Sequence, residues 1–149
     1  MESFPWGNLI TAISTLFAVI LTATITSRRG FRAKLWDLKR EAYGEILHNL
    51  REGIAHLQEV AASQRAGNND AAIAANRRVE EAANAARICV VRGSVFLPEH
   101  FLAAYDEYTA ELLKAATSEN EDRVQAEIAV IQSHRIKLQQ LARSEIMKG

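Results

Sequence analysis

The stretch that decides the fold runs from Asn8 to Ser27, NLITAISTLFAVILTATITS, and it contains no charged residue. About 20 residues that rise 1.5 Å each form a helix of roughly 30 Å, the thickness of the hydrocarbon core of a bilayer. A buried helix of a soluble protein seldom needs an apolar run of this length. We therefore predict a transmembrane helix over residues 8–27, preceded by a short extracytoplasmic tail, residues 1–7.

A basic collar, residues 28–40, follows the apolar run and sets its orientation. Lys and Arg beside a membrane helix favour the cytoplasmic side, and the tail before the run holds only the acidic Glu2. A cleaved signal peptide would carry its positive charge before the apolar run. We expect a single-pass protein of the inner (plasma) membrane, with its N-terminus outside and residues 31–149 forming a cytoplasmic domain.

The collar also makes membrane lipid an expected partner. Its first part would lie at the headgroups, where each basic side chain contributes about 1 kcal/mol with anionic lipid. The residues concerned are Arg28, Arg29, Arg32 and Lys34. We interpret them as an orientation signal, with recognition of a specific lipid as the alternative. Nucleic acid is not an expected partner, because the collar lacks interleaved residues that read bases.

Small residues recur at every fourth position of the apolar run, at Ser14, Ala18, Thr22 and Thr26. Such a face lets two membrane helices approach closely, and hydroxyl groups can form hydrogen bonds across the contact. Homo-oligomerisation through this face is one interpretation. In the other, Ser and Thr hydroxyls bond the carbonyl groups of their own helix.

Apolar residues at helical spacing then continue to the end of the chain and predict four amphipathic helices. The first is expected over 31–63, the second over 71–92, the third from Pro98 to about Ala116 and the fourth over 120–147. The second has a thin apolar stripe: Ile73, Val79, Ala83, Ala86 and Val90. The predicted fold class is all-α, an N-terminal transmembrane helix followed by an antiparallel bundle of four amphipathic helices.

The connections carry ordinary helix-boundary signals. AGNND, residues 66–70, predicts a turn in which Asn69 or Asp70 caps the next helix. Gly93 should lie just past the second helix, although a short hairpin around it is an alternative. Pro98 suits the first position of the third helix, and Ser118 with Glu121 fits a capping box.

A polar row on the first domain helix contains the one pattern typical of metal sites. Glu45 and His48 have the E-x-x-H spacing of di-iron bundles, and Glu52 and His56 continue the row. Glu127 and His134 on the last helix are further candidates. Such sites need two of these motifs, so we interpret the row as a solvated face with favourable Glu–His contacts and expect no metal and no cofactor.

The remaining reactive or aromatic residues are interpreted as core. Cys89 lies among β-branched residues and is expected to be a small buried hydrophobe. Phe96, Phe101, Tyr105 and Tyr108 are spaced for packing rather than for a ligand pocket. A glycine-rich phosphate loop, paired cysteines and a nucleophile elbow are absent from the sequence, so we predict that the protein is not an enzyme.

The run from Arg28 to Leu50, RRGFRAKLWDLKREAYGEILHNL, resembles small bacterial or prophage single-pass membrane proteins. These have an N-terminal anchor, basic residues and a helix with a W-x-x-K-R-E-A-Y-like phrase, here Trp36 to Tyr43. The resemblance implies a bacterial inner-membrane location and does not indicate any particular activity.

Three functions are compatible with these features. The first is a membrane-anchored helical interaction or scaffold protein with an unidentified protein partner. The second is a membrane effector of the holin, exclusion or toxin kind, in which an oligomeric anchor perturbs the bilayer. The third is a bundle that binds a small ligand or a metal.

Overall fold

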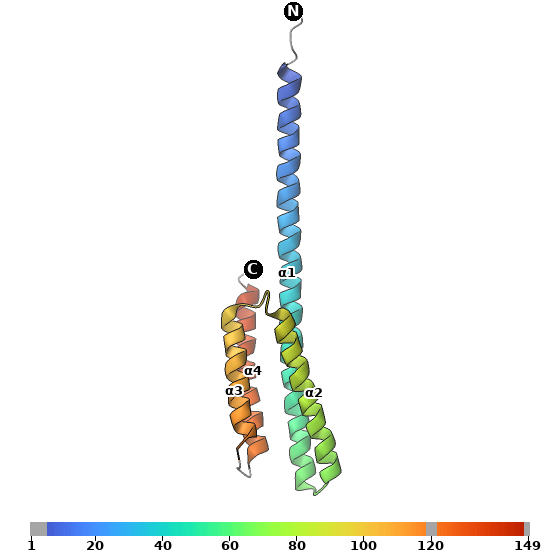
Figure 1. Cartoon of the computed structure of the whole chain (residues 1–149), viewed down its shortest axis with the longest axis vertical. Helices are drawn as coiled ribbons and strands as arrows, with labels where there is room; N and C mark the ends of the chain where they lie inside the picture. The colour runs from blue at the N-terminus through green and yellow to red at the C-terminus, as the bar shows by residue number, and fades with distance from the viewer. Residues whose placement is uncertain (1–5, 119–121, 148–149) are drawn as a thin grey trace, which may run out of the picture. The chain divides into compact units, whose positions relative to one another are not determined.

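The computed structural model describes residues 6–118 and 122–147, and the side chains of residues 6–26, 28 and 29 lie outside this description. Among the described residues there are four helices and no strand, which confirms the predicted all-helical bundle. They are α1 (Trp6–Arg65), α2 (Asn69–Gly93), α3 (Glu99–Ala116) and α4 (Arg123–Met147) (Figure 1). The chain forms two compact units, residues 1–37 and residues 38–149, and the bundle belongs to the second.

Helix α1 is a single helix that contains both the predicted span and the predicted first domain helix, a continuity that the sequence left open. Between Ser27 and Leu35 the chain contains Gly30 but no Pro, and a single Gly costs a helix only about 1 kcal/mol. Apart from Ser27, the side chains of the predicted span, residues 8–27, lie outside the description. Within the part whose side chains are described, none of the helices has the length and apolar character that crossing a membrane requires.

A Schellman turn ends α1. Gly67 adopts a φ of 67°, the left-handed conformation that glycine tolerates best. The Asn68 amide then donates to the Ser63 carbonyl at 2.9 Å, and the Gly67 amide donates to the Gln64 carbonyl at 3.0 Å. Asn68 also caps α2, because its side-chain oxygen accepts from the Ala71 amide at 3.1 Å. The turn was predicted correctly, but the capping residue is Asn68 rather than Asn69 or Asp70.

The second connection is tightly packed. Helix α2 includes Gly93 as its last residue, so the hairpin alternative is wrong, and α3 begins at Glu99 with Pro98 as its N-cap. A Cβ added to Gly93 would lie 2.7 Å from Cδ1 of Leu97, so a larger residue would displace that buried side chain. Helix α4 begins at Arg123, later than the predicted Asn120, and the proposed capping box at Ser118 and Glu121 falls partly on residues outside the description.

The core of the bundle is formed mainly by α1, α3 and α4. Its largest fully buried side chains are Tyr43, Ile46, Leu57, Phe101 and Leu138. The rings of Tyr43 and Phe101 meet edge to face, with their centroids 4.8 Å apart. Phe101, Tyr105 and Tyr108 are buried, as predicted, and Phe96 is partly buried against the core.

Helix α2 buries only part of the predicted stripe: Ala86 is buried, and Val79 and Val90 pack partly buried against the core. Its buried residues are alanines and the terminal glycine: Ala72, Ala75, Ala82, Ala86 and Gly93. Ile73, assigned to the buried stripe, is 68% exposed, and Ala83 is also exposed. Alanine fits both environments, so an alanine-rich helix gives a weak amphipathic signal.

Contacts between helices show that neighbours run in opposite directions. Cys89 of α2 contacts Glu45 of α1, and Arg78 lies 3.0 Å from Glu59. Near the other end of the chain, Nε2 of His100 at the start of α3 lies 3.6 Å from the carboxylate of Glu145 at the end of α4. The carboxylate of Glu145 also helps raise the pKa of Tyr43, after burial, to about 12. The end of α4 is therefore close to the start of the bundle segment of α1, as up-and-down connections require.

Candidate functional site

The predicted membrane-contact face, Ser14, Ala18, Thr22 and Thr26, lies outside the described side chains, as do Arg28 and Arg29. Arg32 and Lys34, the other two residues of the expected headgroup contact, are exposed. The roles assigned to these eight residues therefore stay predictions.

The residues of the polar row on α1 do not share a common partner. Glu45 faces Cys89, His48 is exposed, and Nδ1 of His56 lies 3.5 Å from Glu59. Of the residues that the structure describes, no three or more His, Cys, Asp or Glu side chains are placed to hold one metal ion. The weak candidates Glu45, His48, Glu52 and His56 are thus not brought together as a metal centre.

Cys89 packs against the core, as predicted, but it also makes a polar contact. It is only partly buried, and its Sγ–H donates to Oε2 of Glu45 at 3.1 Å. Burial, followed by this hydrogen bond and the charge of Glu45, raises the pKa of the thiol to about 11. The thiol is therefore protonated at neutral pH, and a reactive thiolate is disfavoured.

Two half-exposed acidic residues of α3, Glu107 and Glu111, bridge α3 and α4. Nε2 of His134 lies 2.9 Å from Oε2 of Glu111, and the ammonium group of Lys137 contacts the carboxylate of Glu107. His134 is 6% exposed, and its ring lies against that of Tyr108, with centroids 5.9 Å apart. These contacts hold the α3–α4 hairpin together and leave Glu111 half exposed.

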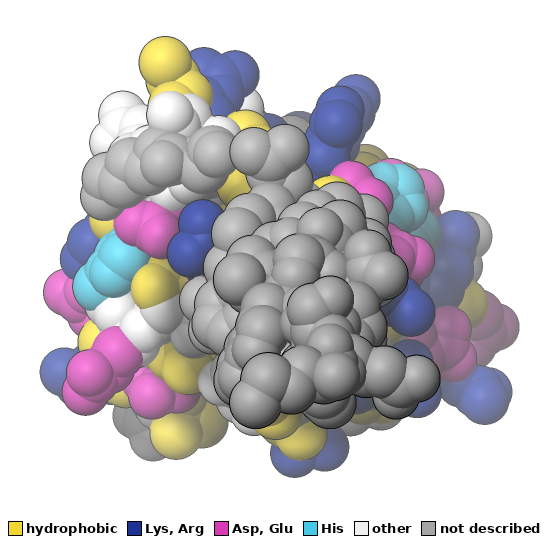
Figure 2. Space-filling view, turned by 90° about the horizontal axis from the view of Figure 1, so that it is seen from above, with side chains coloured by type: hydrophobic (Ala, Val, Ile, Leu, Met, Phe, Trp, Pro, Cys, Tyr) yellow, Lys and Arg dark blue, Asp and Glu magenta, His cyan; other side chains and the backbone are white. Residues whose placement is uncertain are grey.

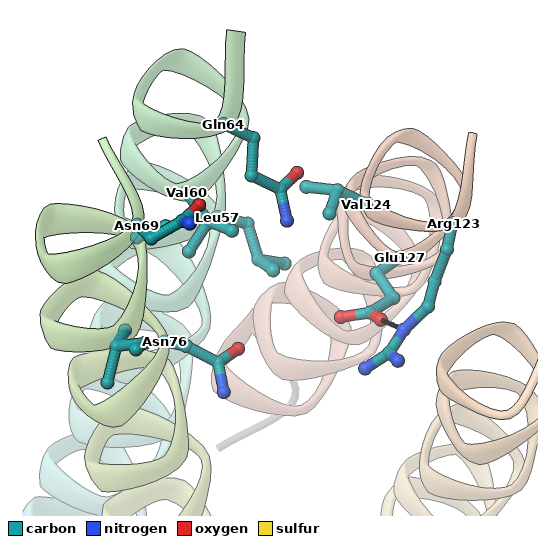
Figure 3. A pocket seen from close by; sticks show the side chains of 10 residues that line it. Leu57, Val60, Gln64, Asn69, Asn76, Arg123, Val124 and Glu127 are labelled. Carbon is teal, nitrogen blue, oxygen red and sulfur yellow. Dashed lines mark hydrogen bonds and ion pairs between the residues drawn. The ribbon is translucent and has the colours of Figure 1, made fainter. Parts of the chain in front are cut away.

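A cleft of about 670 Å³ opens at the end of the bundle where α1 ends and α4 begins. We call it the distal cleft. Residues from α1, α2 and α4 line it: Leu57, Val60, Gln64, Asn69, Ala72, Ile73, Asn76, Arg123, Val124 and Glu127. In Figure 3 the side chains of Gln64 and Asn76 extend from the α1–α2 side toward the Val124 and Glu127 side chains of α4.

The distal cleft combines an apolar floor with a charged wall. Leu57 and Val60 are buried at its base. Across from the amide side chains, Nε of Arg123 donates to Oε1 of Glu127 at 2.8 Å, one helical turn apart. Glu127 is 7% exposed, an unusual burial for a carboxylate. This arrangement can hold a small molecule that has both a polar group and an apolar body.

Sequence analysis did not identify the distal cleft. Glu127 was considered only as an addition to a metal site, Asn69 only as a helix cap, and Gln64 and Asn76 had no assigned role. The one available signal of the cleft was Glu127, a charged residue that lies next to Ile128 on the apolar stripe of the last helix. The other lining residues come together through the register of three helices, which no local pattern specifies.

Comparisons of the chain with protein-family models, with curated proteins and with solved structures returned no match. The fold and the cleft define the class, an all-helical bundle with a mixed polar and apolar cleft at one end.

Proposed function

We propose that this chain is a membrane-anchored helical interaction protein, with residues 8–27 in the inner membrane and the bundle in the cytoplasm. The observation that carries the proposal is the unbroken course of α1 from Trp6 to Arg65. One helix thereby joins the uncharged run to the helix that supplies much of the bundle core. The exposed side chains of Arg32 and Lys34 follow the run, where headgroup contacts would be made.

The described surface of the bundle favours a protein partner. Val91 near the end of α2 is 65% exposed, Val95 in the connection that follows is 91% exposed, and Leu113 on α3 is 65% exposed. Figure 2 shows Lys and Arg side chains interspersed with Asp and Glu side chains around the bundle. Nucleic-acid-binding proteins instead gather basic side chains on one face.

Fractionation of bacterial cells that express the chain tests the anchor. The full chain should remain in the membrane after a high-salt or alkaline wash, and a variant that lacks residues 8–27 should be released. Release of the full chain by salt alone would contradict the proposal, because a peripheral protein held by charge is displaced in this way.

Cysteine labelling tests the orientation, since Cys89 is the chain's one cysteine. In a Cys89→Ala background, Ser3→Cys should react with an impermeant maleimide on intact spheroplasts. Ala103→Cys, at an exposed position of α3, should react only after the membrane is permeabilised. The reverse pattern would place the bundle outside and overturn the assignment of sides.

A further inference from the structure

We infer that the distal cleft is a binding site for a small organic cation, an aliphatic amine or diamine whose ammonium group is held by Glu127. The inference concerns the bundle and does not depend on the membrane anchor.

Glu127 keeps unused capacity to bind a cation. A carboxylate offers about four acceptor sites, and a buried one is stable only when its charge is compensated. Oε1 accepts from Arg123, while Figure 3 shows the other carboxylate oxygen directed into the cleft toward the α1–α2 side. A negatively charged acceptor on the wall of an open cleft attracts an ammonium group.

Arg123 is a displaceable partner for this carboxylate. Its side chain is 52% exposed, whereas that of Glu127 is 10% exposed, so the guanidinium covers Glu127 from the solvent side. An ion pair between side chains one helical turn apart is weak when one partner is as exposed to water as Arg123 is. A ligand ammonium group can therefore replace the guanidinium. The Arg123 side chain would then rotate out into the solvent at little cost.

The rest of the cleft suits an aliphatic body and a second polar end. Leu57, Val60 and Val124 provide apolar contact for methylene groups. Beyond them, the side-chain carbonyl groups of Gln64, Asn69 and Asn76 can accept hydrogen bonds from a second amine. An anion fits less well, because Arg123, the cleft's cation, is already paired and an anion would face Glu127.

Calorimetric titration of the full chain in a non-ionic detergent tests the inference with three probes of similar length. Putrescine carries two ammonium groups, butanediol is neutral and succinate carries two carboxylates. We expect saturable binding of putrescine and none of the other two at the same concentrations. Absence of putrescine binding at millimolar concentration, or binding of succinate instead, would overturn the inference.

Two variants should change the affinity in opposite directions. Glu127→Gln removes the charge and should weaken putrescine binding at least tenfold. Arg123→Gln removes the competitor and should strengthen binding several-fold, which a merely destabilising substitution would not do. A full-affinity Glu127→Gln variant, or an Arg123→Gln variant that loses binding, would each contradict the assigned site.

The chain contains a matched control for both substitutions. Arg77 and Glu81 form a pair of the same residue types in the same order and spacing, 3.3 Å apart on the exposed side of α2. Arg77→Gln and Glu81→Gln change the net charge identically and lie outside the cleft. Both should bind putrescine as the unmodified chain does. If their affinities changed in parallel with those of the Glu127 and Arg123 variants, the changes would reflect the net charge of the chain and not the cleft.

Discussion

The thiol of Cys89 on α2 donates a hydrogen bond to the carboxylate of Glu45 on α1, with Sγ and Oε2 3.1 Å apart. Two consecutive helices are thus joined, through residues 44 positions apart, by a contact that also controls the chemistry of the chain's one cysteine. Burial is the largest cause of the raised thiol pKa of about 11, and Glu45 supplies the next two contributions.

Replacement of Glu45 by Gln should therefore make Cys89 more reactive. The variant removes a negative charge beside the thiol and lowers its pKa, and each unit of that decrease raises the thiolate fraction tenfold while the thiol is mainly protonated. We expect alkylation by iodoacetamide at pH 8 to become several-fold faster. Glu41→Gln, an exposed carboxylate one turn earlier on α1, is the control. Equal rates in both variants would mean that Glu45 does not control the thiol.

Glu107 and Lys137 should produce a measurable pH dependence. The hydrogen bond from Lys137 and then its charge lower the pKa of Glu107 from the ordinary value of 4.5. A lowered pKa in the folded chain means that the contact stabilises the fold above the unfolded pKa and is lost as the pH falls through the folded one. Carboxyl NMR should give a midpoint below 4.5 for Glu107, and Lys137→Met should raise it. An unchanged midpoint in that variant would contradict the assignment.

Tyr43 carries a hydroxyl that contributes little to stability. The residue is 1% exposed, and its hydroxyl oxygen has no hydrogen-bond partner among the described residues. Removing an unpaired buried hydroxyl is neutral or stabilises by about 1 kcal/mol, so Tyr43→Phe should fold at least as stably as the original chain. Tyr43→Ala should cost about 3–5 kcal/mol, because it also removes the ring that packs against Phe101. Urea denaturation distinguishes these values, and a large loss in Tyr43→Phe would reveal a partner for the hydroxyl.

Two glycines in helices should respond in opposite ways to replacement by Ala. A Cβ at Gly44 meets nothing within 4 Å, so Gly44→Ala should stabilise the bundle by about 0.5–1 kcal/mol through helix propensity. A Cβ at Gly93 would lie 2.7 Å from the buried Leu97 side chain, so Gly93→Ala should destabilise by about 1 kcal/mol or more. Equal stabilities of the two variants would show that Leu97 has room to move.

Features that depend on a local pattern, such as a buried helix face, can be predicted from the sequence. Features that depend on how the helices pack against one another cannot. The spacing of Ile46, Leu50 and Leu57 identifies a buried face of α1, and these residues are buried. Three polar residues in a row, Asn68 to Asp70, permit three capping registers, and the left-handed Gly67 selects the first.

The face of α2 and the distal cleft were not predictable in the same way. The alanines of α2 give almost no contrast between its sides, so the orientation of Ile73 follows from how α2 packs. In the distal cleft, Gln64, Asn76 and Glu127 lie far apart in the chain and are ordinary surface residue types. Their convergence follows from the register of three helices.

The small-residue face of the apolar run provides a test of self-association in the membrane. If Ser14, Ala18, Thr22 and Thr26 line a helix–helix contact, the paired change Ala18→Leu and Thr22→Leu should separate the backbones and weaken a membrane-dimerisation reporter severalfold. The matched control, Leu16→Ile with Ile20→Leu, changes residues on the other side of the same helix and should leave the signal as it is. An equal signal from all three chains would mean that the hydroxyls bond their own helix.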